Sequence, residues 1–202
     1  MDSPKSELIR ARVVGTSPLA ADVRTALLSS GALLIEGGHG PDTIDAMVFA
    51  PWDRSAMTAV PFDELSDDQF DQAWQHTMDE AIAACSEART SFGPSGGAIV
   101  LTTFTTGFAG GAGYAHWAAA AEGVHILAKS LARQWGPEGI SVNALALSPD
   151  EVGVDTTISG PISIALPARP GASWSSTLAF LCSSSARDLA GQTLTVDGGL
   201  WM

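Results

Sequence analysis

The chain has 202 residues, of which 46% are hydrophobic and 16% charged, and its formal net charge is −12. This charge excludes nucleic acid and anionic membranes as expected partners, because both are bound through clustered positive charge. Without an apolar run of about 18 residues, and with a polar start that lacks the core of a signal peptide, the chain is expected to be cytoplasmic.

The first elements predicted along the chain are strands with one helix between them. Residues 10–17 (RARVVGTS) and 32–38 (ALLIEGG) each contain an apolar run typical of a strand, as do residues 44–51 (IDAMVFAP). Between the first two, Ser17 is expected to cap a helix that has Pro18 at its first position and ends before Gly31. Uniformly apolar strands are typical of a parallel sheet covered on both faces.

The rest of the chain continues the alternation. Long helices are predicted over 65–93 and from about Tyr114 to Trp135, and a further helix over 173–191. Ser66 and Gln69 have the spacing of a capping box at the start of the first of these. The remaining strands are expected within 96–104, 139–147 and 192–199. The pattern predicts one α/β domain over residues 1–202, with a Rossmann-like, doubly wound and mostly parallel sheet of about six strands.

Two stretches of the sequence resemble those of a known family. Residues 136–147 (GPEGISVNALAL) and 180–202 (FLCSSSARDLAGQTLTVDGGLWM) resemble the short-chain dehydrogenase/reductase family. In that family a helix, a strand and a second helix separate the second and fourth strands. Here only a few residues separate 32–38 from 44–51, so the resemblance implies a truncated sheet without the third family strand and its flanking helices.

The resemblance also places the family's catalytic residues. Counting back from residues 128–140 (AKSLARQWGPEGI), the Ser, Tyr and Lys positions are held by Phe104, Trp117 and Ala121. The family mechanism needs a tyrosine whose pKa is lowered by a lysine one helical turn away. Tyr114 is the only tyrosine, and Lys129 lies roughly 22 Å from it along a helix. We therefore expect no catalytic residue at these positions.

The sequence predicts neither a cofactor site nor a metal site. The turn after the first strand has Gly15 as its only glycine, and Pro18 and Leu19 stand where a dinucleotide-binding turn needs small residues with free N–H groups. We expect no cofactor. Cys85 and Cys182 are expected to be buried free thiols, and no metal site is predicted, because neither cysteine has a nearby histidine or second cysteine at ligand spacing.

Three residues are alternative acid or base groups. His116 sits beside Trp117 but about 100° away around the helix, so we expect it to face the surface or an interface instead of the family pocket. Tyr114 is expected to be packed, and Asp150 after a strand is expected to be solvated. The remaining pocket, lined by Phe104 and Trp117, is expected to be filled by those aromatic rings.

The long second helix is apolar on nearly all sides, which predicts burial on nearly all sides. In the family that the chain resembles, the helix pair at this position typically forms a four-helix contact between subunits, so the resemblance implies an oligomer interface at Trp74, Ala118, Ala119, Ile126 and Trp201. The leading hypothesis for function is a non-catalytic subunit that supports an active dehydrogenase/reductase of the same family in a hetero-oligomer, a heterotetramer of two plus two. The alternatives are a cofactor-independent isomerase, lyase or cyclase that uses the same crevice, and a ligand-binding module. A nicotinamide oxidoreductase with migrated catalytic residues is the least favoured hypothesis.

Overall fold

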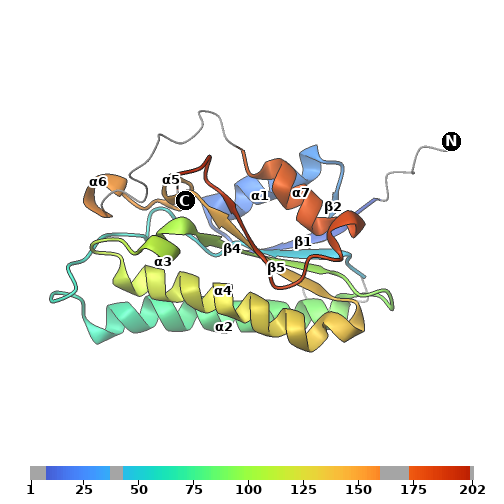
Figure 1. The fold of residues 1–202 in the computed structure, drawn as a ribbon, viewed down its shortest axis with the longest axis horizontal. Coiled ribbons are helices and arrows are strands. Elements are labelled where there is room, and N and C mark those ends of the chain that lie inside the picture. Colours follow the sequence, from blue (N-terminus) through green and yellow to red (C-terminus); the bar gives the residue numbers. More distant parts are fainter. Residues whose placement is uncertain (1–7, 37–42, 160–172, 201–202) are drawn as a thin grey trace.

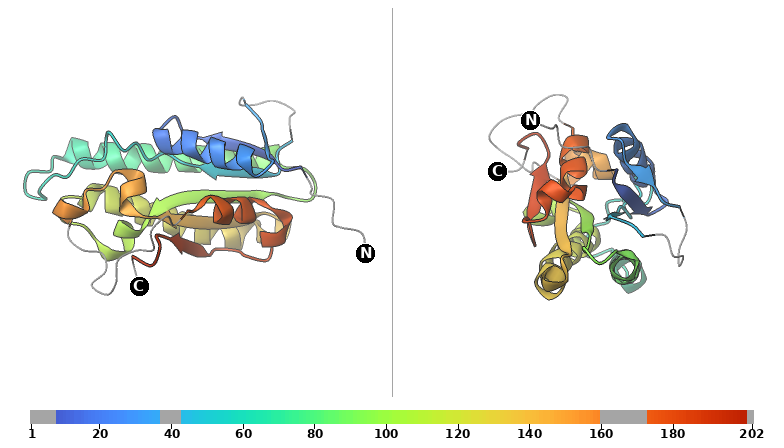
Figure 2. Two further views of the ribbon diagram at one scale, coloured as in Figure 1. Left: turned by 90° about the horizontal axis from the view of Figure 1, so that it is seen from above. Right: turned by 90° about the vertical axis from the view of Figure 1, so that its right-hand side faces the viewer.

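The computed structural model describes residues 8–36, 43–159 and 173–200. In these ranges it contains one six-stranded sheet in the order β2-β1-β3-β4-β5-β6, and all strand pairs are parallel. Helices cover both faces, with α1 and α7 on one side and α2 and α4 on the other (Figures 1 and 2). The prediction of a Rossmann-like parallel sheet is confirmed.

The strands differ greatly in length. They are β1 (Arg10–Val14), β2 (Leu33–Leu34), β3 (Ala46–Phe49), β4 (Ala98–Phe104), β5 (Ser141–Leu147) and β6 (Thr193–Val196). Every residue of β4 and β5 is buried, which matches their mostly apolar sequences and their place inside the sheet. The core of the protein is therefore centred on this pair of strands.

The four longer helices are α1 (Pro18–Ser29), α2 (Asp67–Ser91), α4 (Ala115–Trp135) and α7 (Ser175–Cys182). The Ser17 hydroxyl caps α1 by accepting from the Ala20 N–H, with Pro18 in the first position as predicted. The capping box at the start of α2 is also confirmed, because the side chains of Ser66 and Gln69 each bond the other's backbone N–H.

Several expected boundaries are wrong. The strand expected over 32–38 pairs only at Leu33 and Leu34, and the chain beyond Glu36 lies outside the described residues until 43. The helix expected over 173–191 is α7 followed by a short 3₁₀ turn at Ser184–Ala186. Further short helices were not predicted: α3 (Thr105–Ala109), α5 (Pro149–Val152), α6 (Thr156–Ser159) and a 3₁₀ turn at Gly136–Glu138.

The sheet order fixes where a ligand can approach. From β1 the chain moves to β2 on one side, and it then returns to β3 on the other side of β1. In open parallel sheets, such a reversal leaves a crevice outside the carboxyl ends of the two strands. A ligand-binding crevice is therefore expected beyond Val14 and Phe49, where β1 and β3 end.

None of the helices in the described ranges has the length and the apolar composition of a membrane span.

Cys85 and Cys182 are buried and free, as predicted, and burial raises the pKa of each thiol to about 12. Neither thiol is therefore a nucleophile at neutral pH.

Candidate functional site

A crevice of about 590 Å³ lies beyond the carboxyl ends of β1 and β3. Its walls are the turn at 14–17, the segment from Pro51 to Val60, one face of α2 and the start of α4. The α2 residues follow helical spacing, so they share one face of the helix: Gln69, Gln72, Ala73, His76, Thr77 and Glu80. The crevice is of the size and position at which α/β proteins bind small molecules.

His116 is placed differently from the expectation. It is only 3% exposed and lines the crevice together with Trp117, so the prediction that it faces the surface or an interface is wrong. Its Nδ1 is buried and has no hydrogen-bond partner within the described residues, and the same is true of Trp117 Nε1. Burial lowers the pKa of His116, so its imidazole is neutral at pH 7.

The floor of the crevice is formed by Trp52, which sequence reasoning did not single out. Trp52 is 1% exposed, and its Nε1 donates to the carbonyl oxygen of Thr102 at 2.8 Å. Its ring meets Phe104 edge-on, with ring centroids 5.0 Å apart. Phe104 is fully buried behind Trp52 and does not line the crevice. The expectation of one pocket lined by both Phe104 and Trp117 is wrong, because Phe104 is packed against Trp52 and only Trp117 borders the open crevice.

The two remaining candidate residues lie outside the crevice. Tyr114 is packed, as predicted, and its hydroxyl oxygen accepts a hydrogen bond from the Asp155 N–H at 2.9 Å. Asp150 is exposed at the start of α5 and accepts from the Ser148 hydroxyl at 2.5 Å. The structure thus brings His116 to the crevice but not Tyr114 or Asp150. Ala121 is fully buried on α4, one turn after Trp117.

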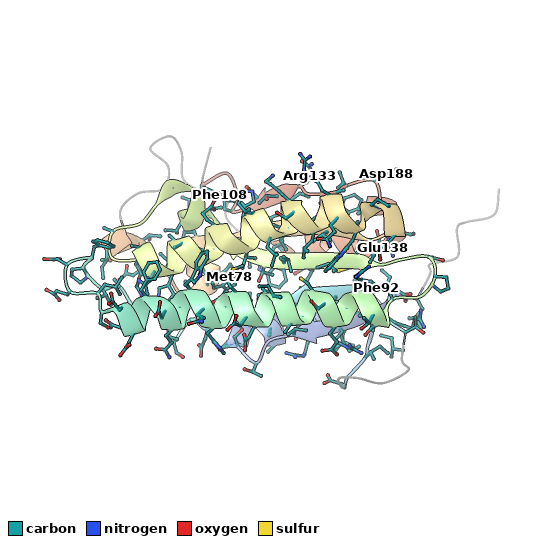
Figure 3. All side chains as sticks on the ribbon, turned by 90° about the horizontal axis from the view of Figure 1, so that it is seen from below. Met78, Phe92, Phe108, Arg133, Glu138 and Asp188 are labelled. Carbon is teal, nitrogen blue, oxygen red and sulfur yellow. The ribbon has the colours of Figure 1, made fainter. Side chains whose placement is uncertain are left out.

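Figure 3 shows α2 and α4 side by side. Of the expected interface residues, Trp74 lies on α2, and Ala118, Ala119 and Ile126 lie on α4. Trp74 and Ile126 are 38% and 55% exposed, Ala118 and Ala119 are partly buried, and Trp201 lies outside the described residues. Trp74 packs on Gly123, where an added Cβ would lie 2.9 Å from the indole ring. The interface itself stays a prediction.

Together, the sheet order and the crevice define an α/β protein of the dinucleotide-binding type of fold. The chain belongs to the short-chain dehydrogenase/reductase family, since the family model described as enoyl-(acyl carrier protein) reductase matches residues 42–201. Among solved structures, the Bacillus cereus enoyl-acyl carrier protein reductase has a TM-score of 0.74 at 22% identity, covering 94% of this chain and 95% of that one. A gluconate 5-dehydrogenase from Beutenbergia cavernae has a TM-score of 0.72 at 20% identity, covering 98% and 99%.

Named relatives show more sequence similarity. The (-)-trans-carveol dehydrogenase of Rhodococcus erythropolis is 29% identical over 227 residues, covering 96% of this chain and 74% of the relative. The 3-oxoacyl-[acyl-carrier-protein] reductase of Staphylococcus aureus is 32% identical over 146 residues, covering 65% of this chain and 58% of the relative. The match to the corresponding Salmonella typhimurium reductase spans 46% of that protein's length. These relatives are named as dehydrogenases and reductases, so the prediction of a non-catalytic supporting subunit is wrong.

The nicotinamide dinucleotide that this family implies does not fit the turn between β1 and α1. A pyrophosphate needs free N–H groups at the helix N-terminus. Pro18 has no N–H, and the N–H groups of Ala20 and Ala21 donate to the side chain and carbonyl of Ser17, both at 3.2 Å. Within the described part of the chain, no lysine or arginine lines the crevice.

A pH dependence follows from the burial of His116. Because its pKa is lowered on folding, the unfolded chain binds the proton more readily once the pH falls below the ordinary value of 6.5. We expect the free energy of unfolding to decrease between about pH 7 and about pH 5. Urea unfolding at these two pH values should show a smaller decrease for His116→Gln. His76→Gln, at a 70% exposed side chain, is the control and should behave like the wild type. Equal pH dependence in all three proteins would contradict the prediction.

Proposed function

We propose that the protein is an enzyme that acts on a small uncharged alcohol or carbonyl compound bound in the crevice. The observation that carries the proposal is the place of His116, which is only 3% exposed and lies in the wall of an open crevice of about 590 Å³. A neutral imidazole in such a wall can hydrogen-bond a ligand hydroxyl or carbonyl group.

The lining of the crevice supports this class of ligand. Its volume lies in the usual range for small-molecule sites, and its lining combines aliphatic and indole side chains with hydroxyl, amide, imidazole and carboxylate groups. The lack of lysine and arginine among its described lining residues disfavours phosphate and carboxylate ligands. The carveol dehydrogenase relative is named for an uncharged alcohol, which agrees with the same class.

His116 is the group that we assign to proton transfer. We place the family's Ser, Tyr and Lys positions at Phe104, Trp117 and Ala121, none of which ionises, and we read Gly15, Pro18 and Leu19 as a degenerate cofactor turn. His116 is then the buried titratable group that the crevice presents to a ligand. As a neutral imidazole it can exchange a proton with a hydroxyl or carbonyl oxygen within hydrogen-bond reach. The proposal takes residues 1–202 as a single domain.

Binding of carveol tests the proposal. Carveol should quench the fluorescence of the wild-type protein, because Trp52 and Trp117 both line the crevice. His116→Gln should weaken carveol binding by roughly tenfold, since a hydrogen bond to a buried ligand oxygen is lost or misplaced. Trp74→Phe, on α2 outside the crevice, should bind carveol like the wild type.

Two results would contradict the proposal. One is a wild-type protein that does not bind carveol, and the other is His116→Gln that binds it with unchanged affinity. Turnover of carveol with added NAD⁺ or NADP⁺, followed by the absorbance of the reduced nicotinamide, reports separately whether oxidation takes place. Such turnover would show that the β1–α1 turn accepts a dinucleotide despite its occupied N–H groups.

A further inference from the structure

Tyr114 connects the start of α4 to the segment that leads into α6. The residue is only 2% exposed, and its hydroxyl oxygen accepts a hydrogen bond from the Asp155 N–H at 2.9 Å. Figure 1 shows α3 and α6 at the end of the molecule where α4 begins. The two residues are 41 positions apart in the chain, so this hydrogen bond joins two elements that the sequence separates widely.

The segment that carries Asp155 is itself held in place. Val154 is 4% exposed, and its N–H donates to the Pro149 carbonyl oxygen at 2.9 Å. The Asp155 carboxylate accepts from the Thr157 N–H at 2.8 Å, which closes the turn into α6. The hydroxyl group of Tyr114 is therefore bonded to a backbone group that packing and local hydrogen bonds already fix.

The backbone next to Tyr114 is attached to the wall of the crevice. The Gly113 carbonyl oxygen accepts from the N–H of Val60, a crevice-lining residue, at 2.8 Å. Gly113 has φ +79°, and an added Cβ would lie 2.9 Å from the Ala59 Cβ, so the two segments are in close contact. The Tyr114 carbonyl oxygen accepts from the Ala118 N–H at 2.8 Å. The first turn of α4 is thus held by the crevice wall through the backbone and by the α6 segment through the tyrosine ring.

His116 and Trp117 lie in this first turn, and both line the crevice. Neither His116 Nδ1 nor Trp117 Nε1 has a hydrogen-bond partner within the described residues, so no bond from these atoms fixes either ring. The place of the imidazole therefore depends on the backbone that carries it. Groups that are held in the binding geometry before the ligand arrives bind it more tightly, because less freedom is lost on binding.

We propose that Tyr114 is a positioning residue, whose hydrogen bond to Asp155 holds the first turn of α4 so that His116 stays in place in the crevice wall. The inference rests on the proposed function, in which His116 bonds the ligand oxygen. It assigns no proton transfer to Tyr114, which does not line the crevice. The only tyrosine of the sequence acts through the residue that follows it by two positions.

A double-mutant cycle tests the inference. Tyr114→Phe keeps the packed ring and removes the hydroxyl group, and we expect it to weaken carveol binding about fivefold. In the His116→Gln background the same change should weaken binding by less than about twofold, because the group that Tyr114 positions is already absent. Thr103→Val removes a hydroxyl hydrogen bond to the Ala121 carbonyl oxygen, farther along α4, and as the control it should bind carveol like the wild type. Tryptophan fluorescence measures each affinity.

The NMR signals of the imidazole rings give a second readout that needs no ligand. We expect Tyr114→Phe to shift the signals of His116, because the turn that carries this ring loses one of its attachments. The signals of His125, farther along the same helix, should keep their positions and serve as the internal control. Signals of His116 that do not move would overturn the inference.

The outcomes distinguish the inference from the proposed function. An equal loss of carveol affinity in both backgrounds, or no loss in the wild-type background, would overturn the inference and leave the proposed function standing. A wild-type protein that does not bind carveol would overturn the proposed function, and the NMR signals of His116 would then decide whether Tyr114 holds this residue in place.

Discussion

Replacing Gly15 with alanine is expected to lower the free energy of unfolding by about 3 kcal/mol. Gly15 has φ +133°, a region that L side chains rarely adopt, and an added Cβ would lie 2.2 Å from the carbonyl oxygen of Ala50. That carbonyl follows β3, which pairs with β1, so neither backbone can withdraw without breaking the sheet. The same residue borders the crevice, so carveol binding should weaken as well.

Control variants separate the backbone strain at Gly15 from the clash of an added Cβ with Ala50. Gly31 has φ +90° and open space around its Cβ position, so Gly31→Ala reports backbone strain alone, about 1 kcal/mol. Gly136 has an ordinary φ and open space, so Gly136→Ala should change stability by less than about 0.5 kcal/mol. Urea unfolding of the three variants measures these differences. If Gly15→Ala were as stable as Gly136→Ala, the close approach of Gly15 to Ala50 would be disproved.

Replacing Trp52 with alanine is expected to cost about 3–5 kcal/mol of unfolding free energy. The variant loses the packing of a fully buried indole against Phe104 and its hydrogen bond to Thr102, and it leaves a cavity below the crevice. Because Trp52 also forms the floor of the crevice, we expect carveol binding to be abolished.

Two variants test the origin of the Trp52 effect. Trp52→Phe keeps an aromatic ring but loses the N–H donor, so its stability should lie between the wild type and Trp52→Ala. Trp74→Ala removes an indole that is 38% exposed, and it should cost only about 1 kcal/mol. Equal losses for Trp52→Ala and Trp74→Ala, measured by urea unfolding, would contradict the close packing of Trp52 against Phe104.

The alternation of apolar strands and capped helices was sufficient to predict the fold. It identified the sheet, the start of α1 and the capping box of α2, because these depend on residues that are close in the chain. Strand length was harder to predict. The run Ala32–Ile35 is as apolar as a full strand, but it pairs with β1 only at Leu33 and Leu34, and pairing is decided by the neighbouring strand.

The site could be predicted only in part. A helical wheel separates His116 from Trp117 by about 100°. Both nevertheless border the crevice, because α4 begins at Ala115 and the crevice lies at its first turn. Trp52 was missed because its burial depends on contacts with Thr102 and Phe104, some fifty residues later in the chain. The lack of a hydrogen-bond partner for His116 Nδ1 among the described residues has no local sequence signal at all.

The functional hypothesis failed for a different reason. Non-ionising residues at Phe104, Trp117 and Ala121 indicate that those positions do not transfer protons. They do not indicate that the rest of the crevice is inactive, and the open crevice beside His116 was not foreseen. The inference that a chain with such residues is non-catalytic was wrong, because the relatives are named as dehydrogenases and reductases.

The brevity of β2 has a consequence for behaviour in concentrated solution. An outermost strand exposes a row of free peptide groups, and another molecule can pair with them and start an ordered aggregate. Here that strand is two residues long, so β2 itself offers a second chain only a short stretch of backbone to extend. At this edge of the sheet, the shortness of the pairing surface itself protects the protein against amyloid-like growth, although Leu33 is exposed there.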